Sequence, residues 1–308
     1  MKILVTGGAG FIASHIVDSL IKLQYEVVVI DNLSTGNIKN INKSCTFYKL
    51  DLMDPALENI FDSFKPEVVI HHAAQVSVLN SLNQPLLDSS VNINGTIRIL
   101  DLMKRFKSKK IIYASSAAVY GIPNQLPITE NHLIRPISFY GISKYVPEQY
   151  IAIYSELYGL DYTILRYSNA YGPRQVSYGE GGVVSIFIDK LINNEYPVIF
   201  GDGEQIRDFI FVKDIVSANL SAINNGSRDV YNISSGTETT INKLLSNICY
   251  TLGVEYSPQY ASSRKGDILH SCLSNEKAIK DLGWNPEFSL DHGILETCEY
   301  YQKCEVYL

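Results

Sequence analysis

The sequence contains 308 residues, with 46% hydrophobic and 19% charged side chains and a formal net charge of −6. This length allows one large domain or two unequal domains around a sizeable buried core. The net negative charge gives no indication of nucleic-acid binding. The sequence also lacks a run of basic residues of the kind that binds membrane surfaces. A phosphorylated ligand stays open, because a local site can be basic on an acidic protein.

Five scattered cysteines, none in a C-x-x-C pair, indicate neither a disulfide framework nor a zinc site. His71 and His72 end an apolar run, and we expect them to pack rather than to bind a metal. The run Lys2–Thr6 lacks the charged and apolar regions of a signal peptide, and no apolar stretch reaches the length of a membrane span. We therefore expect a soluble cytoplasmic protein without a metal or a membrane partner.

Short apolar runs rich in β-branched residues alternate with longer helical patterns through the first half of the chain. Apolar strands separated by helices are typical of a parallel sheet that is covered on both faces. The predicted strands are 3–6, 26–31, 45–50, 67–71, 110–115 and 162–167, and the predicted helices are 11–23, one after Pro55, 85–107 and 140–158. The predicted fold class is therefore α/β, with a Rossmann-like doubly wound parallel sheet.

The regular alternation weakens after about residue 170, where glycine-rich loops such as Gly201-Asp202-Gly203 separate mixed elements. We expect residues 1–170 to form a nucleotide-binding domain, with a segment near 210–235 returning to its sheet. Residues 171–308 would mainly form a smaller mixed α/β C-terminal domain that binds the substrate.

The run TGGAG at 6–10 lies between the first predicted strand and the first predicted helix. At such a turn, the pyrophosphate of a dinucleotide meets a helix N-terminus and its free N–H groups. Two registers fit, G-x-x-G-x-x-A starting at Gly7 and G-x-G-x-x-A starting at Gly8, and both end at Ala13.

The second predicted strand ends in Asp31, about twenty residues after the glycine turn, where a carboxylate would accept the ribose hydroxyls. An acid at this position repels a 2′-phosphate, so the sequence favours NAD over NADP. Asp51 and Leu52, at the end of the third predicted strand, are placed to meet the adenine ring.

Tyr140 and Lys144 are four residues apart on a predicted helix and so lie on one face of it. A free phenol is a poor base at neutral pH, since its pKa is near 10. We expect the ammonium of Lys144 and a cationic nicotinamide to lower the pKa of Tyr140 and so favour the phenolate. The hydroxyl of Ser116 would share the proton of the substrate oxygen.

The order of these motifs resembles the extended short-chain dehydrogenase/reductase family, and within it the nucleotide-sugar epimerases. The resemblance covers essentially the whole chain, although Ala13 stands where the family usually has Gly. It rests on TGGAGFIAS at 6–14, VVVIDNLSTG at 27–36, HHAAQ at 71–75, VNINGT at 91–96, YASSAAVYG at 113–121, FYGISK at 139–144, LRYSNAYGPRQ at 165–175, FGDGEQIRDFIFVKDI at 200–215 and SRKGD at 263–267.

The resemblance implies roles for residues that match the family's motifs. The implied catalytic residues are Ser116, Tyr140 and Lys144. The implied NAD-binding residues are Gly7, Gly10, Phe11, Ile12, Asp31, Asn32, Asp51, Leu52, Ala73, Ala74, Asn92, Ser115, Tyr140, Lys144 and Tyr167. The implied substrate-binding residues are Ser116, Tyr140, Asn169, Phe200, Arg207, Arg264, Asp267 and Ser271. Two of these, Arg207 and Arg264, carry planar forks that suit phosphate oxygens.

The residues after Ser116 distinguish the possible reactions. Dehydratases and decarboxylases of the family place acids there, whereas this chain has Ala117 and Ala118, which cannot transfer protons. The resemblance therefore implies NAD-dependent 4-epimerisation of a UDP-hexose through a transient 4-keto sugar. Another sugar dehydratase, decarboxylase or reductase, or a non-catalytic NAD-binding regulator, remains the alternative.

Two further features of the family concern the substrate and the assembly. The residue four beyond the Asp of R-x-G-D gates the space at C2 of the sugar, and here it is Ser271 rather than a bulky Tyr. This implies that UDP-GlcNAc and UDP-GalNAc are accepted as well as UDP-glucose and UDP-galactose. The helices near 85–107 and 141–158 resemble those that pair across a homodimer in this family.

Overall fold

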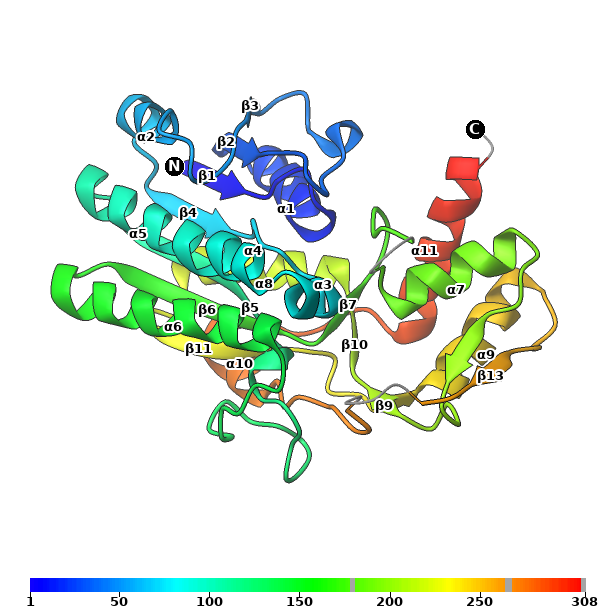
Figure 1. The fold of residues 1–308 in the computed structure, drawn as a ribbon. Helices are drawn as coiled ribbons and strands as arrows, with labels where there is room; N and C mark the ends of the chain where they lie inside the picture. Colours follow the sequence, from blue (N-terminus) through cyan, green and yellow to red (C-terminus); the bar gives the residue numbers. More distant parts are fainter. Residues whose placement is uncertain (178–180, 264–267, 306–308) are drawn as a thin grey trace.

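The computed structural model describes residues 1–177, 181–263 and 268–305. Its centre is a seven-stranded sheet with the order β11-β6-β5-β4-β1-β2-β3 (Figure 1). All neighbouring strands in it are parallel. The strands are β1 (Lys2–Thr6), β2 (Glu26–Asp31), β3 (Thr46–Lys49), β4 (Val68–His71), β5 (Lys110–Ser116), β6 (Asp161–Tyr167) and β11 (Asp229–Ile233).

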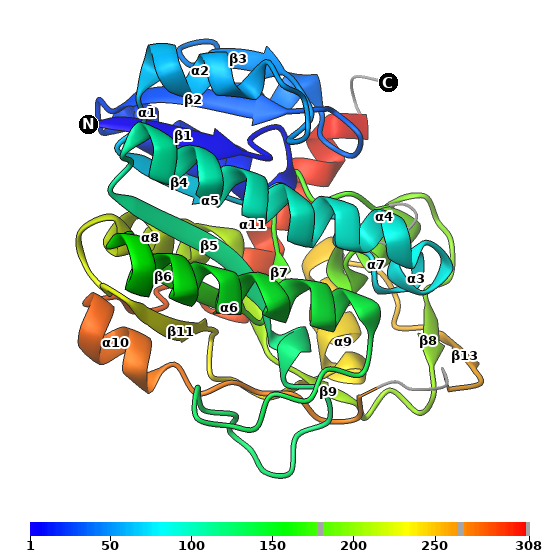
Figure 2. The ribbon, with the colours of Figure 1, turned by 60° about the vertical axis from the view of Figure 1, so that its left-hand side comes forward.

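Both faces of the sheet are covered because its strands are apolar on both sides. In β1, Ile3 and Val5 belong to the core on one face, whereas Leu4 belongs to the core on the other. Figure 2 shows α5 and α6 in front of the sheet and α8 behind it. The helices of the first face are α1 (Phe11–Lys22), α8 (Val212–Asn224) and α10 (Glu276–Leu282), and those of the second are α2 (Leu57–Phe64), α5 (Gly95–Phe106) and α6 (Phe139–Tyr158).

The observed strands of the first half agree with the predicted ones to within a residue or two, and the doubly wound α/β fold class is confirmed. The predicted helix 85–107 is a continuous helical run in three parts: α4 (Pro85–Ser89), a π-helical turn η2 (Ser90–Asn94) and α5. The short helix α3 (Val78–Asn83) was not predicted, since six residues are too few to establish a helical period.

The second half contains three sheets of only two strands each. They pair β7 (Asn169–Tyr171) with β10 (Phe209–Phe211), β9 (Ile206–Arg207) with β12 (Thr239–Thr240), and β8 (Val198–Phe200) with β13 (Gln259–Ala261). Their core is shared with α7 (Val183–Ile192), α9 (Ile241–Leu252) and α11 (Leu290–Glu305). Short 3-10 turns, η1 (Ile38–Asn40) and η3 (Ala117–Val119), complete the elements.

The main sheet also receives residues from the second half of the sequence. Strand β11 lies beside β6, and Trp284 belongs to the same apolar core as Ile3 of β1. The strand order reverses between β1 and β4, and such a switch point at the carboxyl ends of parallel strands is where α/β proteins bind nucleotides. The glycine turn follows β1 at this position.

Candidate active site

The glycine turn is packed too closely against neighbouring backbone to carry side chains at Gly7 and Gly10. Gly7 has φ +71°, and a Cβ there would lie 2.7 Å from the amide nitrogen of Ala73. A Cβ at Gly10 would lie 3.1 Å from the carbonyl oxygen of Gly7. Helix α1 begins directly afterwards, with no side-chain cap at Gly10 and no acidic residue in its first turn. The exposed N–H dipoles therefore suit an anionic pyrophosphate.

Asp31 lies at the carboxyl end of β2, beside the same turn. One of its carboxylate oxygens accepts from the amide of Ala9 at 2.9 Å and the other from that of Leu33 at 2.8 Å. These two bonds fix a charged acceptor where a ribose would follow a pyrophosphate on the glycine turn. The turn and Asp31 together fit the NAD group that the sequence indicates.

The predicted adenine-side residues also cluster. Asn32 follows Asp31 and donates from Nδ2 to Oδ2 of Asp51 at 2.9 Å. Leu52 is buried, and a Cβ at Gly95 would lie 2.9 Å from its Cδ1. The ends of β2 and β3 therefore bring together residues that are 19 positions apart in the sequence.

The loop after β4 carries the predicted residues Ala73 and Ala74, and His71 anchors it. The hydroxyl of Thr96 donates to the carbonyl of Asn92, so it accepts from Nε2 of His71 at 3.0 Å. Nδ1 of His71 then accepts from the hydroxyl of Thr6 at 2.6 Å. Burial lowers the pKa of His71 to about 3, which agrees with this neutral, doubly hydrogen-bonded ring.

The three predicted catalytic residues come together at the carboxyl end of β5. Ser116 ends this strand, and it lies close enough to Tyr140 on α6 for its hydroxyl to lower the pKa of that phenol. Lys144 lies one turn further along α6 and is 4% exposed. Its Nζ lies 4.8 Å from the centre of the Tyr113 ring.

Gly141 explains how the helix approaches Ser116 so closely. A Cβ at this position would lie 2.6 Å from the carbonyl oxygen of Ala118, in the turn that follows Ser116. Any side chain there would push α6, and with it the phenol of Tyr140, away from the serine. The hydroxyl of Ser138 accepts from the amide of Gly141 at 3.0 Å and so caps the helix just before the tyrosine.

The expected lowering of the pKa of Tyr140 does not come from the protein's own groups. Burial raises the pKa of Tyr140, the hydrogen bond from Ser116 lowers it in part, and the charge of Asp88 raises it again. Burial also lowers the pKa of Lys144 to about 8, although Glu148 and Asp88 oppose this shift. Desolvation is therefore the largest cause of the pKa shift of both groups, and the lowering that we expected for Tyr140 from the ammonium is not seen.

Asn92 has a structural role that the sequence did not reveal. Its Nδ2 donates to the carbonyl of Gln75 at 2.9 Å and to the hydroxyl of Ser143 at 2.9 Å, and its Oδ1 accepts from the amide of Gln75 at 2.8 Å. Ser143 precedes Lys144, so these bonds tie the catalytic helix to the π-helical turn. Direct contact of Asn92 with NAD stays a prediction.

Two other predicted cofactor residues take part in buried networks. The hydroxyl of Ser115 donates to Glu148 at 2.5 Å, and Glu148 pairs with Arg166 on β6 at 2.5 Å. The hydroxyl of Tyr167 lies 3.0 Å from Nε2 of His72. Glu148 and Arg166 were not singled out in the sequence, because neither lies in a motif spacing that indicates an ion pair.

The predicted substrate residues lie in the second half, around β9 and β10. The amide of Asn169 donates to the carbonyl of Asp208 at 2.9 Å, and the amide of Ser271 donates to that of Ile206 at 3.1 Å. Arg207 lies between Ile206 and Asp208 in the sequence. These two backbone bonds therefore bring Asn169, Arg207 and Ser271 together. Phe200 ends β8. Arg264 and Asp267 lie outside the described residues.

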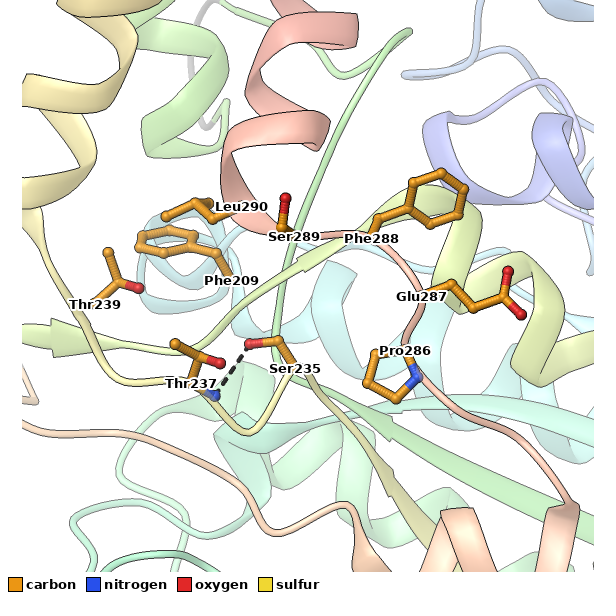
Figure 3. Close-up of a pocket in the computed structure, with 9 residues that line it drawn as sticks. All are labelled: Phe209, Ser235, Thr237, Thr239, Pro286, Glu287, Phe288, Ser289 and Leu290. Carbon is orange, nitrogen blue, oxygen red and sulfur yellow. Dashed lines mark hydrogen bonds between the residues drawn. The ribbon is translucent and has the colours of Figure 1, made fainter.

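A cavity of about 250 Å³ lies in the same half of the molecule (Figure 3). None of the predicted site residues that the structure describes lines it. Its lining comes from the loop after β11, from β10 and from the segment before α11: Phe209, Ser235, Thr237, Thr239, Pro286, Glu287, Phe288, Ser289 and Leu290.

The described part of the chain contains neither a cluster of metal ligands nor a membrane-spanning helix. No group of three or more His, Cys, Asp or Glu side chains there could hold a metal ion. None of the helices in residues 1–177, 181–263 and 268–305 is long and apolar enough to cross a membrane.

Residues 3–234 match the model of the NAD dependent epimerase/dehydratase family. A relative from Methanocaldococcus jannaschii, provisionally named UDP-glucose 4-epimerase, is 50% identical over 293 residues, which cover 95% of each chain. The structure of UDP-glucose 4-epimerase from Thermotoga maritima with UDP-glucose superposes with a TM-score of 0.97 at 44% identity, and the match covers 99% of this chain and 100% of that one. A UDP-N-acetylglucosamine 4-epimerase from Methanobrevibacter ruminantium, in complex with UDP-N-acetylmuramic acid, gives 0.94 at 38% identity over 98% of each chain.

Proposed function

The chain belongs to the NAD dependent epimerase/dehydratase family, and on that premise we propose that it interconverts UDP-hexoses at C4 with NAD as its cofactor. The observation that carries this function is the proximity of Ser116 to Tyr140, whose pKa the serine hydroxyl lowers, with Lys144 one helical turn further on. The glycine turn and Asp31 supply the matching cofactor site on the neighbouring strands.

The reaction requires a base that removes the proton from O4 and later returns it. Tyr140 is that base in our proposal, and Ser116 shares the proton through its hydroxyl. NAD⁺, when bound, would accept the C4 hydride and return it as NADH, and the positive charge of the oxidised form would favour the phenolate. Because burial raises the pKa of Tyr140, the protein alone keeps this phenol protonated at neutral pH.

The residues next to Ser116 support epimerisation rather than elimination. Ala117 and Ala118 form the η3 turn that follows the serine and carry no group that could donate or accept a proton. A 4-keto sugar formed here would find no acid or base at these two positions to remove water across C5 and C6. The proposed course is therefore a reversible oxidation at C4, with return of the hydride to the other face of the sugar.

The choice of sugar is the finer part of the proposal. We propose that Ser271, which is small and partly exposed, leaves room for an N-acetyl group at C2. Both UDP-glucose/UDP-galactose and UDP-GlcNAc/UDP-GalNAc would then be substrates. The likeness to both a UDP-glucose and a UDP-N-acetylglucosamine 4-epimerase supports this range.

The test is product analysis of each of the four UDP-sugars after incubation with the pure protein, with and without added NAD. We expect all four to reach equilibrium with their C4 epimers. Ser271→Tyr should remove turnover of the N-acetyl pair and retain that of the other pair, whereas Ser271→Ala serves as a control of similar size. No turnover of UDP-GlcNAc by the wild type would exclude the broader range.

We also propose different binding roles for the two parts of the chain. Residues 1–170, with the returning β11, would bind NAD, and residues 171–308 would mainly bind the UDP-sugar. We further propose a cytoplasmic location, because the described cysteines Cys45, Cys249, Cys272 and Cys298 are all free thiols.

We propose that the protein forms a homodimer through an exposed apolar surface on α6 and the adjoining α3 and α4. On α6, Ile142, Ile153 and Leu157 are 44%, 51% and 66% exposed. On α4, Leu86 is 84% exposed. Apolar residues that recur along one helix face and remain uncovered in a single chain are typical of a subunit interface.

Analytical ultracentrifugation tests this assembly. Leu157→Glu should convert the dimer to a monomer, because it places a charge within the proposed interface. Leu133 is equally exposed at 66% but lies in the loop before α6 and on none of α3, α4 and α6, so Leu133→Glu is the matched control and should leave the dimer intact. A wild-type protein that sediments as a monomer would contradict the proposal.

A further inference from the structure

Asp208 follows the predicted substrate residue Arg207 and is almost completely buried, with 1% of its surface exposed. Its carboxylate accepts hydrogen bonds from three separate segments of the chain. On Oδ1 the donors are the hydroxyl of Ser168 at 3.2 Å and the amide and hydroxyl of Ser235 at 2.9 and 2.8 Å. On Oδ2 they are the amides of Gly236 at 3.2 Å and Leu273 at 3.3 Å and the thiol of Cys272 at 3.7 Å.

These donors are immediate neighbours of residues predicted to bind the substrate. Ser168 precedes Asn169, and Cys272 follows Ser271. The backbone continues the same connection, because the carbonyl of Asp208 accepts from the amide of Asn169 at 2.9 Å. One side chain therefore joins the segments that carry Asn169, Arg207 and Ser271.

The third segment is the loop after β11, which Figure 3 shows beside β10. Its Ser235 bonds Asp208 and also accepts from the amide of Thr237 through its hydroxyl, the dashed line in the figure, at 3.2 Å. The hydrogen bonds of this loop to the carboxylate of Asp208 therefore help to fix its conformation.

The charge of Asp208 suits this arrangement. An ionised carboxylate can only accept hydrogen bonds, and all of its partners here are donors. No cation pairs with it among the residues that the structure describes, and burial raises its pKa, although the bonds from Ser235, Leu273 and Gly236 oppose that shift. An amide in its place would turn an NH₂ group towards N–H donors and lose several of the bonds at once.

We propose that Asp208 is a positioning residue for the UDP-sugar, which it serves by holding Asn169, Arg207 and Ser271 in one arrangement. This inference rests on the proposed function. The short strands β7, β9 and β10 fix few backbone groups, so the substrate would otherwise have to order these segments when it binds, and that ordering weakens affinity. The cofactor turn and Asp31 are held by other contacts and are unaffected.

The test compares Asp208→Asn with a matched substitution, Asp214→Asn. Asp214 is also 1% exposed and also accepts from backbone amides, those of Glu287 at 2.7 Å and Phe288 at 3.4 Å, but its partners adjoin no predicted substrate residue. The measurements are KM and kcat for UDP-glucose, the Kd for UDP by calorimetry, the NAD content and the melting temperature.

For Asp208→Asn we expect KM and the Kd for UDP to rise by about tenfold or more, with kcat changed by less than about threefold and the NAD content unchanged. For Asp214→Asn we expect a lower melting temperature with KM within about twofold of wild type. Equal losses of melting temperature with an unchanged KM in both variants would overturn the inference and leave Asp208 a purely structural residue.

A milder pair keeps the test decisive if Asp208→Asn fails to fold. Ser168→Ala removes one bond to the carboxylate and should raise KM by about two- to fivefold, whereas Ser168→Thr keeps a hydroxyl and should restore the wild-type value. An unchanged KM in Ser168→Ala would contradict the inference. If wild-type protein neither binds UDP nor epimerises any UDP-sugar, the proposed function fails first, and the two failures are thereby distinguished.

Discussion

Glu148 and Asp208 are buried to nearly the same extent, 2% and 1% exposed, but the two halves of the molecule stabilise them differently. Glu148, in the half with the large sheet, forms an ion pair with Arg166, whose Nη1 also donates to the hydroxyl of Tyr120 at 2.9 Å. Asp208, in the half with the short strands, accepts hydrogen bonds from backbone amides and hydroxyls of loops.

The difference follows from what the backbone already fixes in each half. Five- to seven-residue parallel strands position Arg166 without help, so the ion pair only has to lock α6 against the sheet. Strands of two or three residues cannot hold the loops around them, and a single carboxylate does this instead. In our proposal the chemistry lies on the half with the long strands, and recognition of the substrate depends on the half that is held by loop contacts.

The largest effect that we expect is a loss of turnover that leaves the buried contacts of Glu148 and Asp208 unchanged. Tyr140→Phe removes the proposed base and leaves the buried contacts of both carboxylates in place, so turnover should fall by about 10³-fold or more. The melting temperature, the NAD content and the Kd for UDP should stay close to wild type. Activity near the wild-type level would refute the assignment of the base.

Breaking the ion pair tests the rigid half. Glu148→Gln leaves the guanidinium of Arg166 buried without its counter-charge, and this should cost about 3–5 kcal/mol of unfolding free energy. Chemical denaturation measures it. The double variant Glu148→Gln/Arg166→Met should recover much of the loss, whereas additive losses would show that the charges do not act as a pair.

Lys144→Met should stabilise the fold at neutral pH, whereas Glu148→Gln should destabilise it. Because burial lowers the pKa of Lys144 to about 8, the unfolded chain binds more protons than the folded one between about pH 8 and 10.5. The lysine therefore destabilises the fold below pH 8, and this penalty disappears as the pH rises towards 10.5. The variant should be inactive and more stable at pH 7 by up to about 3 kcal/mol, with the advantage lost above pH 10.5.

The smallest effect concerns a helix of the second half that carries no predicted site residue. The hydroxyl of Thr240 caps α9 by accepting from the amide of Lys243 at 3.1 Å. Thr240→Ala should cost about 1 kcal/mol, measured by denaturation, and leave KM unchanged. A rise in KM here would mean that any loosening of this half weakens substrate binding, and the special role of Asp208 would lose its support.

The sequence predicted the rigid half well and the other half poorly, for a physical reason. Strands such as Glu26–Asp31 carry an unbroken apolar run, since both of their faces are buried. Two-residue strands such as Ile206–Arg207 show no period at all. The residues around Asp208 could not be foreseen either, because they come from segments up to about a hundred positions apart and meet only in the fold.

The same limit applies within the candidate site. Tyr140, Lys144 and Ser116 were predicted from their spacing and motifs, and the structure brings them together. The close approach at Gly141 and the direction of the pKa shift of Tyr140 depend on packing and desolvation, which a motif does not encode.

The π-helical turn at Ser90–Asn94 has a consequence for the surface of the molecule. A π-helical turn closes i→i+5 bonds and so holds about one residue more than an α-helical turn does. Before the turn Leu86 faces outward, and after it Ile99 faces the core. Deleting one residue from the turn would restore a uniform helix, and Leu86 and Ile99 would face nearly as they do now. The wider turn thus accommodates an extra residue in the helical run without rotating its outward and inward surfaces.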